Sequence, residues 1–224
     1  MISENLLKIK ENIEKASIAS GRKADSITLV AVTKNVGIPE CEALLSSEHN
    51  VFGENRVQSL LEKYDVLGDN ATWHLIGHLQ TNKVKYIIDK VSLIHSVDSI
   101  HLAEEIERLS KKQNKVSDIL LQVNVSGEES KFGMPKEELF PTLEKLSSFE
   151  NIKVRGLMTI PPVATFKGEN RKYFKVLYDL FTKINNQFGS NICADYLSMG
   201  MSDDYEDAIL EGANIVRVGR ALYI

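Results

Sequence analysis

The feature that most constrains the fold of this chain is a regular alternation of short apolar, β-branched segments with longer stretches of helical periodicity. Eight segments are predicted to be strands: residues 27–33, 50–53, 72–76, 91–95, 118–125, 152–158, 194–198 and 214–218. Strands that alternate with helices form βαβ units, and consecutive units build a parallel sheet. Eight units predict an α/β fold with a closed (β/α)8 barrel of the TIM type. A doubly wound open sheet is the alternative, because the count could be wrong by one strand.

A helical stretch is predicted between each pair of strands, and three helices can be given bounds. Residues 3–19 carry apolar side chains at steps of four and three, which is typical of an additional N-terminal helix packed on the domain. A coiled-coil partner site is less favoured there, because two heptads are too few. Residues 171–188 place five apolar side chains on one face, and residues 203–211 form a shorter helix. No linker rich in Gly, Pro or Ser interrupts the pattern, so residues 1–224 are predicted to form a single domain.

The composition excludes several classes of function. The chain has 27 Lys and Arg against 31 Asp and Glu, and this net charge of −4 argues against a non-specific nucleic-acid binder. Cys41 and Cys193 are far apart, so neither a disulfide framework nor a cysteine zinc site is expected. The chain has no long apolar run, and residues 1–10 do not resemble a signal peptide. We therefore expect a cytoplasmic protein with neither a nucleic acid nor a membrane as partner.

In a parallel barrel the active site lies at the carboxyl ends of the strands, so the residues that follow each strand are the candidates. Lys34 comes directly after the apolar run 27–33. Apolar surroundings would favour its neutral amine, which can form a Schiff base with an aldehyde. The alternative is a lysine that simply extends from a strand end into solvent. The functional interpretation gains weight only if a phosphate site lies across the barrel mouth.

Such a phosphate site is plausible from the sequence. Barrels often bind phosphate with the loops after strands seven and eight and with a helix N-terminus. Here the predicted seventh strand continues into the small residues of 198–202, and Gly219 follows the eighth strand. The alternative is an ordinary loop with Ser202 as the helix N-cap. That alternative explains Ser202 but not Ser198 or Gly219.

Other motifs carry little chemistry. The chain has neither a G-x-G-x-x-G pattern nor a Walker A pattern, so no dinucleotide or P-loop site is predicted. His74 and His78 are four residues apart, which on a strand separates them by roughly 13 Å and prevents them from sharing a metal. No metal site is predicted. His95 is expected at a strand end, and His78 is expected to have a structural role at the mouth.

Six short motifs occur in order at these strand ends: residues 30–34, 52–55, 73–83, 155–158, 197–202 and 216–219. Together they resemble the pyridoxal 5′-phosphate homeostasis proteins, which are single-domain relatives of the alanine racemase N-terminal barrel. The resemblance covers essentially the whole chain. It implies a modified (β/α)8 barrel that binds pyridoxal 5′-phosphate as a lysine aldimine.

The resemblance also implies which residues bind the cofactor. It assigns Lys34 to the aldimine, Asn55 to the lining of the cofactor, Arg217 to the pyridine nitrogen, and Ser198, Met199, Gly219 and Arg220 to the phosphate. A guanidinium keeps its proton, so Arg217 would leave the ring nitrogen unprotonated and weaken the ring as an electron sink. Some relatives carry Ser or Thr at the position of Arg220. A backbone N–H contact would survive that change, whereas a hydroxyl contact would be lost.

The implied function is storage, buffering or delivery of pyridoxal phosphate, with indirect effects on amino-acid and keto-acid balance and no catalytic residue. Apo enzymes that use pyridoxal phosphate are the expected acceptors, and a monomer is expected. Racemization needs two acid/base groups. The resemblance to racemases places one of them on a second, β-rich domain of the partner subunit, and the predicted barrel leaves no room for such a domain. The last helix is expected to be short or absent. The alternatives are weak amino-acid racemase activity using Lys34 alone, a Schiff-base aldolase, and a partner-binding module.

Overall fold

The computed structural model describes residues 1–184 and 188–224. Its main strands are β1 (Thr28–Val32), β2 (Val51–Glu54), β3 (Thr72–Leu75), β4 (Leu93–Val97), β5 (Ser117–Asn124), β7 (Ile152–Met158), β8 (Ile192–Ser198) and β9 (Ile215–Val218). They are all parallel, in the order β4-β3-β2-β1-β9-β8-β7-β5, and the pairing of β4 with β5 closes the barrel. The predicted (β/α)8 barrel is therefore confirmed, and the open sheet is excluded. A two-residue strand that the sequence did not predict, β6 (Met134–Pro135), pairs with the end of β5.

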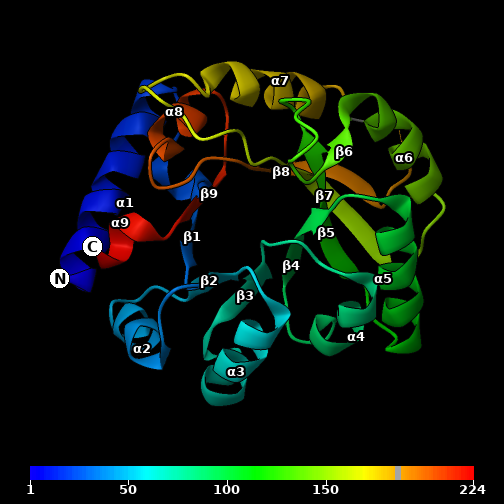
Figure 1. The fold of residues 1–224 in the computed structure, drawn as a ribbon, viewed down its shortest axis with the longest axis horizontal. Helices are drawn as coiled ribbons and strands as arrows, with labels where there is room; N and C mark the ends of the chain where they lie inside the picture. The colour runs from blue at the N-terminus through cyan, green and yellow to red at the C-terminus, as the bar shows by residue number, and fades with distance from the viewer. Residues whose placement is uncertain (185–187) are drawn as a thin grey trace.

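Helices surround the strands as a ring, and the two termini lie close together (Figure 1). They are α1 (Ile2–Ala19), α2 (Ile38–Ser46), α3 (Val57–Leu67), α4 (Val84–Ile87), α5 (Ile100–Lys112), α6 (Leu139–Leu146), α7 (Arg171–Thr182), α8 (Tyr205–Leu210) and α9 (Arg220–Tyr223). Short 3-10 turns cover Ala24–Ser26, Gly68–Asn70, Thr81–Lys83 and Lys136–Glu138. Among the described residues, none of the helices combines the length and the apolar composition that a bilayer span requires.

The predicted helices are found, with changes at their ends. The N-terminal helix α1 packs on the domain through its apolar stripe, and Asn5 ties it to α9 by donating to the carbonyl of Leu222 at 3.2 Å. Helix α7 ends at Thr182, and residues 185–187 of the predicted stretch lie outside the described residues. Helix α8 begins at Tyr205, two residues later than predicted. Its N-cap is Asp204, so the interpretation of Ser202 as the cap is wrong.

The core has two layers because alternate residues of each strand face opposite sides. The larger layer lies between the barrel and the helices and contains Leu29 and Ala31 of β1. Val30, between them, belongs to the smaller layer that fills the barrel interior with Leu120 and Met158. A filled interior means that polar side chains pointing inward are shielded from water, which matters for the site described below.

Strand β7 contains a β-bulge at Arg155. The register of β7 against β5 shifts there, so Arg155 has no opposite residue in β5. The next residue, Gly156, has φ +143°, and a Cβ on it would lie 1.9 Å from the carbonyl oxygen of Tyr196. Only glycine fits this close approach of β7 to β8. A bulge of this kind redirects a side chain, and here it directs Arg155 toward two carboxylates.

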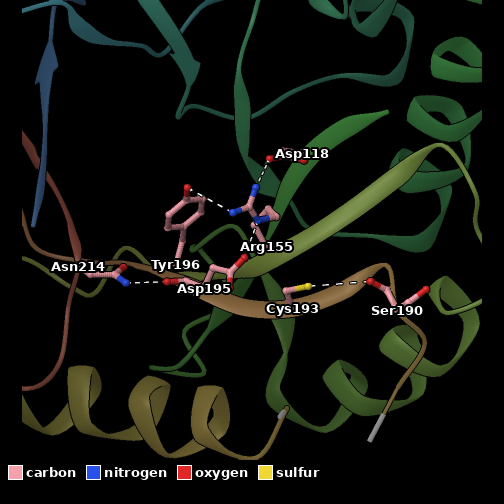
Figure 2. Close-up of polar contacts among 7 residues, drawn as sticks. All are labelled: Asp118, Arg155, Ser190, Cys193, Asp195, Tyr196 and Asn214. Atoms are coloured by element: carbon pink, nitrogen blue, oxygen red, sulfur yellow. Dashed lines mark hydrogen bonds and ion pairs between the residues drawn. The ribbon is translucent and has the colours of Figure 1, made fainter. Parts of the chain in front are cut away.

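Figure 2 shows Arg155 between side chains of β5 and β8. Its guanidinium donates to Asp195 at 2.7 Å and to Asp118 at 2.5 Å. It also lies 4.7 Å from the ring centroid of Tyr196. The Arg155 side chain is only 21% exposed, so these charged contacts are partly shielded from water. The cluster ties three neighbouring strands together.

Replacing Arg155 by methionine is expected to lower the free energy of unfolding by about 1–3 kcal/mol, because two carboxylates lose charged hydrogen bonds. Urea unfolding of the protein measures this change. Arg108→Met is the matched control, because Arg108 pairs with Glu105 on the open surface of α5 and its loss should cost less than about 0.5 kcal/mol. If both variants lose the same stability, the cluster has no special role in joining the strands.

Candidate functional site

A cavity of about 540 Å³ opens at the carboxyl ends of the strands. Five of the seven residues assigned by the resemblance line it: Lys34, Asn55, Arg217, Gly219 and Arg220. They come from the ends of β1, β2 and β9, which are neighbours in the barrel. The two others, Ser198 and Met199, are fully buried and are not among the lining residues.

Lys34 lies in the turn that follows β1, and its side chain is exposed. The expectation of apolar surroundings for its amine is therefore wrong, because the residue has already left the buried part of the strand. The residue before it is firmly held: the Thr33 N–H donates to the carbonyl of Gly53 at 3.0 Å, and the Thr33 carbonyl accepts from Lys63 at 2.5 Å. An accessible amine thus extends into the cavity from a fixed backbone.

Arg217 is a buried cation at the base of this cavity. It is 3% exposed, and its Nη1 and Nη2 donate to Ser198 Oγ at 2.5 Å and to the Thr159 carbonyl at 2.9 Å. Burial lowers the pKa of Arg217 to about 10, which still leaves it charged at neutral pH. Within the described residues no carboxylate lies within ion-pair distance of it. A buried charge of this kind favours a ligand that accepts hydrogen bonds.

Ser202 also lines the cavity and lies beside two backbone N–H groups. Its Oγ accepts from the N–H groups of Gly219 and Ala221 at 3.3 and 3.4 Å, which are long contacts. A Cβ on Gly219 would lie 3.2 Å from the Val32 Cβ, so a larger residue would push against β1. Long contacts to N–H groups at a helix start are ones that an anion can replace.

Ser198 and Met199 are committed to other partners. Ser198 Oγ lies between Arg217 and His95, 2.5 and 2.9 Å away. The Met199 N–H donates to the carbonyl of Ile215 at 3.1 Å within the barrel. The structure therefore places both residues behind the cavity. The sequence analysis considered the Ser202 hydroxyl only as a helix N-cap. Ser202 nevertheless lies four residues after Ser198 in the same loop of small residues.

Asn55 carries an unsatisfied oxygen. Its Oδ1 is buried and has no hydrogen-bond partner among the described residues. An unpaired buried acceptor is costly, so its presence in the wall of a cavity favours a ligand that donates to it. The loop after β3 can approach Asn55 closely because Gly77 has no side chain. A Cβ at that position would lie 2.2 Å from the Asn55 carbonyl oxygen.

Two histidines lie inside the barrel below the cavity. His95 is in the middle of β4 and fully buried, so the expectation of a strand-end histidine is wrong. Its Nε2 lies 3.0 Å from His74 Nδ1. Burial lowers the pKa of His74 to about 4 and the pKa of His95 well below its usual value. His78 lies at the mouth, stacked on Phe132 with 4.4 Å between ring centroids.

Comparisons with known proteins show the family of this chain. Residues 5–224 match the family model of the alanine racemase N-terminal domain. A pyridoxal phosphate homeostasis protein from Aquifex aeolicus is 43% identical over 221 residues, which are 98% of this chain and 96% of that protein. The chain belongs to the pyridoxal phosphate homeostasis protein family. The family resemblance found in the sequence motifs is thereby confirmed.

Solved structures extend the comparison to the fold of this family. A structure of PipY from Synechococcus elongatus with PLP bound superposes with a TM-score of 0.88 at 31% identity, and the match covers 100% of both chains. An alanine racemase from Clostridium difficile has a TM-score of 0.71 at 17% identity, and the match covers 98% of this chain but 55% of that one. At that identity the racemase shares the fold alone.

Proposed function

We propose that this member of the pyridoxal phosphate homeostasis family binds pyridoxal 5′-phosphate at Lys34 and takes part in its intracellular storage, buffering or delivery. The observation that carries the proposal is one cavity that contains a lysine amine, a buried guanidinium and N–H groups at a helix start. The bound PLP in the PipY structure and the name of the Aquifex aeolicus relative support the choice of ligand.

The lysine suits reversible binding. Pyridoxal phosphate supplies an aldehyde that condenses with a primary amine and releases water. Lys34 provides that amine from a turn whose preceding residue is fixed, and its exposure lets water and other amines reach the covalent bond. A site open to water favours exchange of the bound molecule, whereas enzymes that use the same chemistry close their sites.

Arg217 and Asn55 suit the ring. The guanidinium of Arg217 can only donate hydrogen bonds, so it would keep the pyridine nitrogen as an acceptor without a proton. Such a ring withdraws electrons weakly, which argues against strong carbanion chemistry and supports a non-catalytic role. The unpartnered Oδ1 of Asn55 can accept from a hydroxyl of the ring.

For the phosphate we propose Ser202 together with the backbone N–H groups of Gly219 and Arg220. Ser202 replaces Ser198 and Met199 in this assignment, because those two are committed inside the barrel. The side chain of Arg220 pairs with Asp203 at the rim. A backbone contact at position 220 therefore requires no hydroxyl there.

The experiment that tests this function is a titration of the purified protein with pyridoxal phosphate, followed by visible absorbance, borohydride reduction and peptide mapping. A new visible band and a single label on Lys34 support the proposal. Labels spread over surface lysines would contradict it. Incubation of the loaded protein with an apo enzyme then measures delivery, and proton exchange at Cα of alanine in D2O measures the alternative racemase activity, which we expect to be absent.

The phosphate assignment predicts a selective effect of Ser202→Ala. This variant should bind pyridoxal phosphate about 3–10 times more weakly, because one hydrogen bond to an anion is lost. Its affinity for pyridoxal, which has no phosphate, should be unchanged. Ser198→Ala is the matched control and should leave the ratio of the two affinities as in the wild type. If Ser198→Ala alone changes that ratio, the phosphate assignment is wrong.

We further propose that residues 1–224 act as one domain and as a monomer in the cytoplasm, with apo enzymes as acceptors. The continuous barrel supports the single domain. Light scattering of the loaded and unloaded protein tests the monomer, and a dimer in either state would contradict it.

A further inference from the structure

A row of four buried polar side chains lies below the cavity, and three of its members have no part in the function proposed above. It runs from His74 of β3 through His95 of β4 and Ser198 of β8 to Arg217 of β9. Successive polar atoms are 3.0, 2.9 and 2.5 Å apart, and each side chain is buried. Polar groups inside a barrel cost free energy unless each is satisfied, so the arrangement of their protons is constrained.

The hydrogen-bond donors and acceptors of this row can be assigned by starting from Arg217. A guanidinium has only donors, so Ser198 accepts from Arg217. The Ser198 hydroxyl has one hydrogen to donate, and among the described residues His95 Nδ1 is the only atom within hydrogen-bond distance that can accept it. His95 therefore accepts at Nδ1, carries its proton on Nε2 and donates to His74 Nδ1. Every hydrogen bond in the row then has one donor and one acceptor.

The charges agree with this arrangement. Burial lowers the pKa of both histidines, and the positive charge of Arg217 lowers that of His95 further. Both rings are therefore neutral at physiological pH, as the proton arrangement requires. If His95 were protonated on both nitrogens, the Ser198 hydroxyl hydrogen would have no acceptor. The imidazolium would also be repelled by the guanidinium of Arg217, which is separated from it only by Ser198.

The row holds one nitrogen of Arg217, and Thr159 holds another. Nη1 is fixed by Ser198 from β8, and Nη2 is fixed by the carbonyl after β7 at 2.9 Å. The Thr159 side chain is itself anchored, because it donates to the Val123 carbonyl at 2.8 Å. With two nitrogens fixed from two strands, the plane of the guanidinium is set, and its remaining donors have a defined direction at the cavity.

We propose that His95 is a positioning residue for Arg217: through the Ser198 hydroxyl it fixes the guanidinium in the orientation that contacts the ring nitrogen of bound pyridoxal phosphate. This inference rests on the proposed function. It adds a residue that touches no ligand and that determines how strongly the site distinguishes a pyridine ring from a benzene ring.

The test compares pyridoxal phosphate with its 1-deaza analogue, in which a carbon replaces the ring nitrogen. The wild type is expected to prefer pyridoxal phosphate by roughly tenfold, because a hydrogen bond from a charged donor is lost with the analogue. In His95→Leu, which removes the acceptor at similar volume, the preference should fall below about threefold. In His95→Asn, whose side-chain oxygen can replace Nδ1 as the acceptor for Ser198, most of the preference should return.

A merely structural role would weaken the binding of both compounds by the same factor, and an unchanged preference in His95→Leu would overturn the inference while leaving the proposed function intact. A wild type that binds neither compound would overturn both. If His95→Leu does not fold, the ¹⁵N spectrum of the histidines in the apo protein shows which ring nitrogen of His95 carries the proton. A proton on Nε2 of His95 supports the inference, and a proton on Nδ1 overturns it.

Discussion

Lys34→Ala is expected to abolish the covalent adduct with pyridoxal phosphate and to raise the dissociation constant roughly 100-fold, about 2.7 kcal/mol. Lys34 is the one lysine among the described residues that line the cavity, so no other amine there replaces it. The visible band and the borohydride-stable label should both disappear. Absorbance, mass spectrometry of the reduced protein and equilibrium dialysis measure these three changes.

Two further variants identify the cause of the loss. Lys34→Arg keeps a positive charge but has no amine that attacks an aldehyde, so it should lose the label while binding the phosphate compound more tightly than Lys34→Ala. Lys83→Ala removes an exposed lysine after β3 and should behave as the wild type. A label that persists in Lys34→Ala, at any other lysine, would remove Lys34 from the proposed site.

The barrel could be predicted from the sequence because its signals are local. Strands covered on both sides are largely apolar, as in β1, and the intervening helices show periodic apolar stripes, as in α1. Burial on both faces of a strand also limits the prediction, because the sequence then does not show whether a residue faces the barrel interior or the helices. All five residues of β4 are buried, so the sequence cannot distinguish the barrel interior from the helix layer, and His95 was placed at a strand end rather than inside. Strand β6 has two residues, too few for any pattern.

The position of the cavity could be predicted from the sequence, because the strand ends of a parallel barrel converge whatever the conformation of the loops. The choice between Ser198 and Ser202 depends on backbone geometry instead. Between them Gly200 has φ +92°, and the chain turns there from the barrel interior to the cavity wall. A buried ion pair joins Lys63 of α3 to Glu54 of β2, and the sequence analysis did not predict it. The sequence does indicate that Lys63 is buried, because it lies on the apolar face of α3 with Leu60 and Leu67.

Lys63→Met is expected to lower the free energy of unfolding by about 3–5 kcal/mol, because it leaves a buried carboxylate without its cation. The Glu54 side chain is fully buried and the Lys63 side chain is 8% exposed. Glu54 Oε1 also accepts from the Thr33 hydroxyl at 2.6 Å, whereas its Oε2 has no partner among the described residues. The charge on Glu54 is therefore compensated chiefly by Lys63. Chemical denaturation of the apo protein measures the loss.

The double variant Lys63→Met/Glu54→Gln separates charge from packing. It removes the uncompensated carboxylate while keeping an acceptor for Thr33, so at least half of the lost stability should return. Lys90→Met is the surface control, because Lys90 pairs with a half-exposed Asp89 and should change stability by less than about 0.5 kcal/mol. A double variant as unstable as the single one would show that the lysine acts through packing alone.

Because Lys63 also donates to the Thr33 carbonyl, Lys63→Met should weaken pyridoxal phosphate binding at Lys34 even where the protein remains folded.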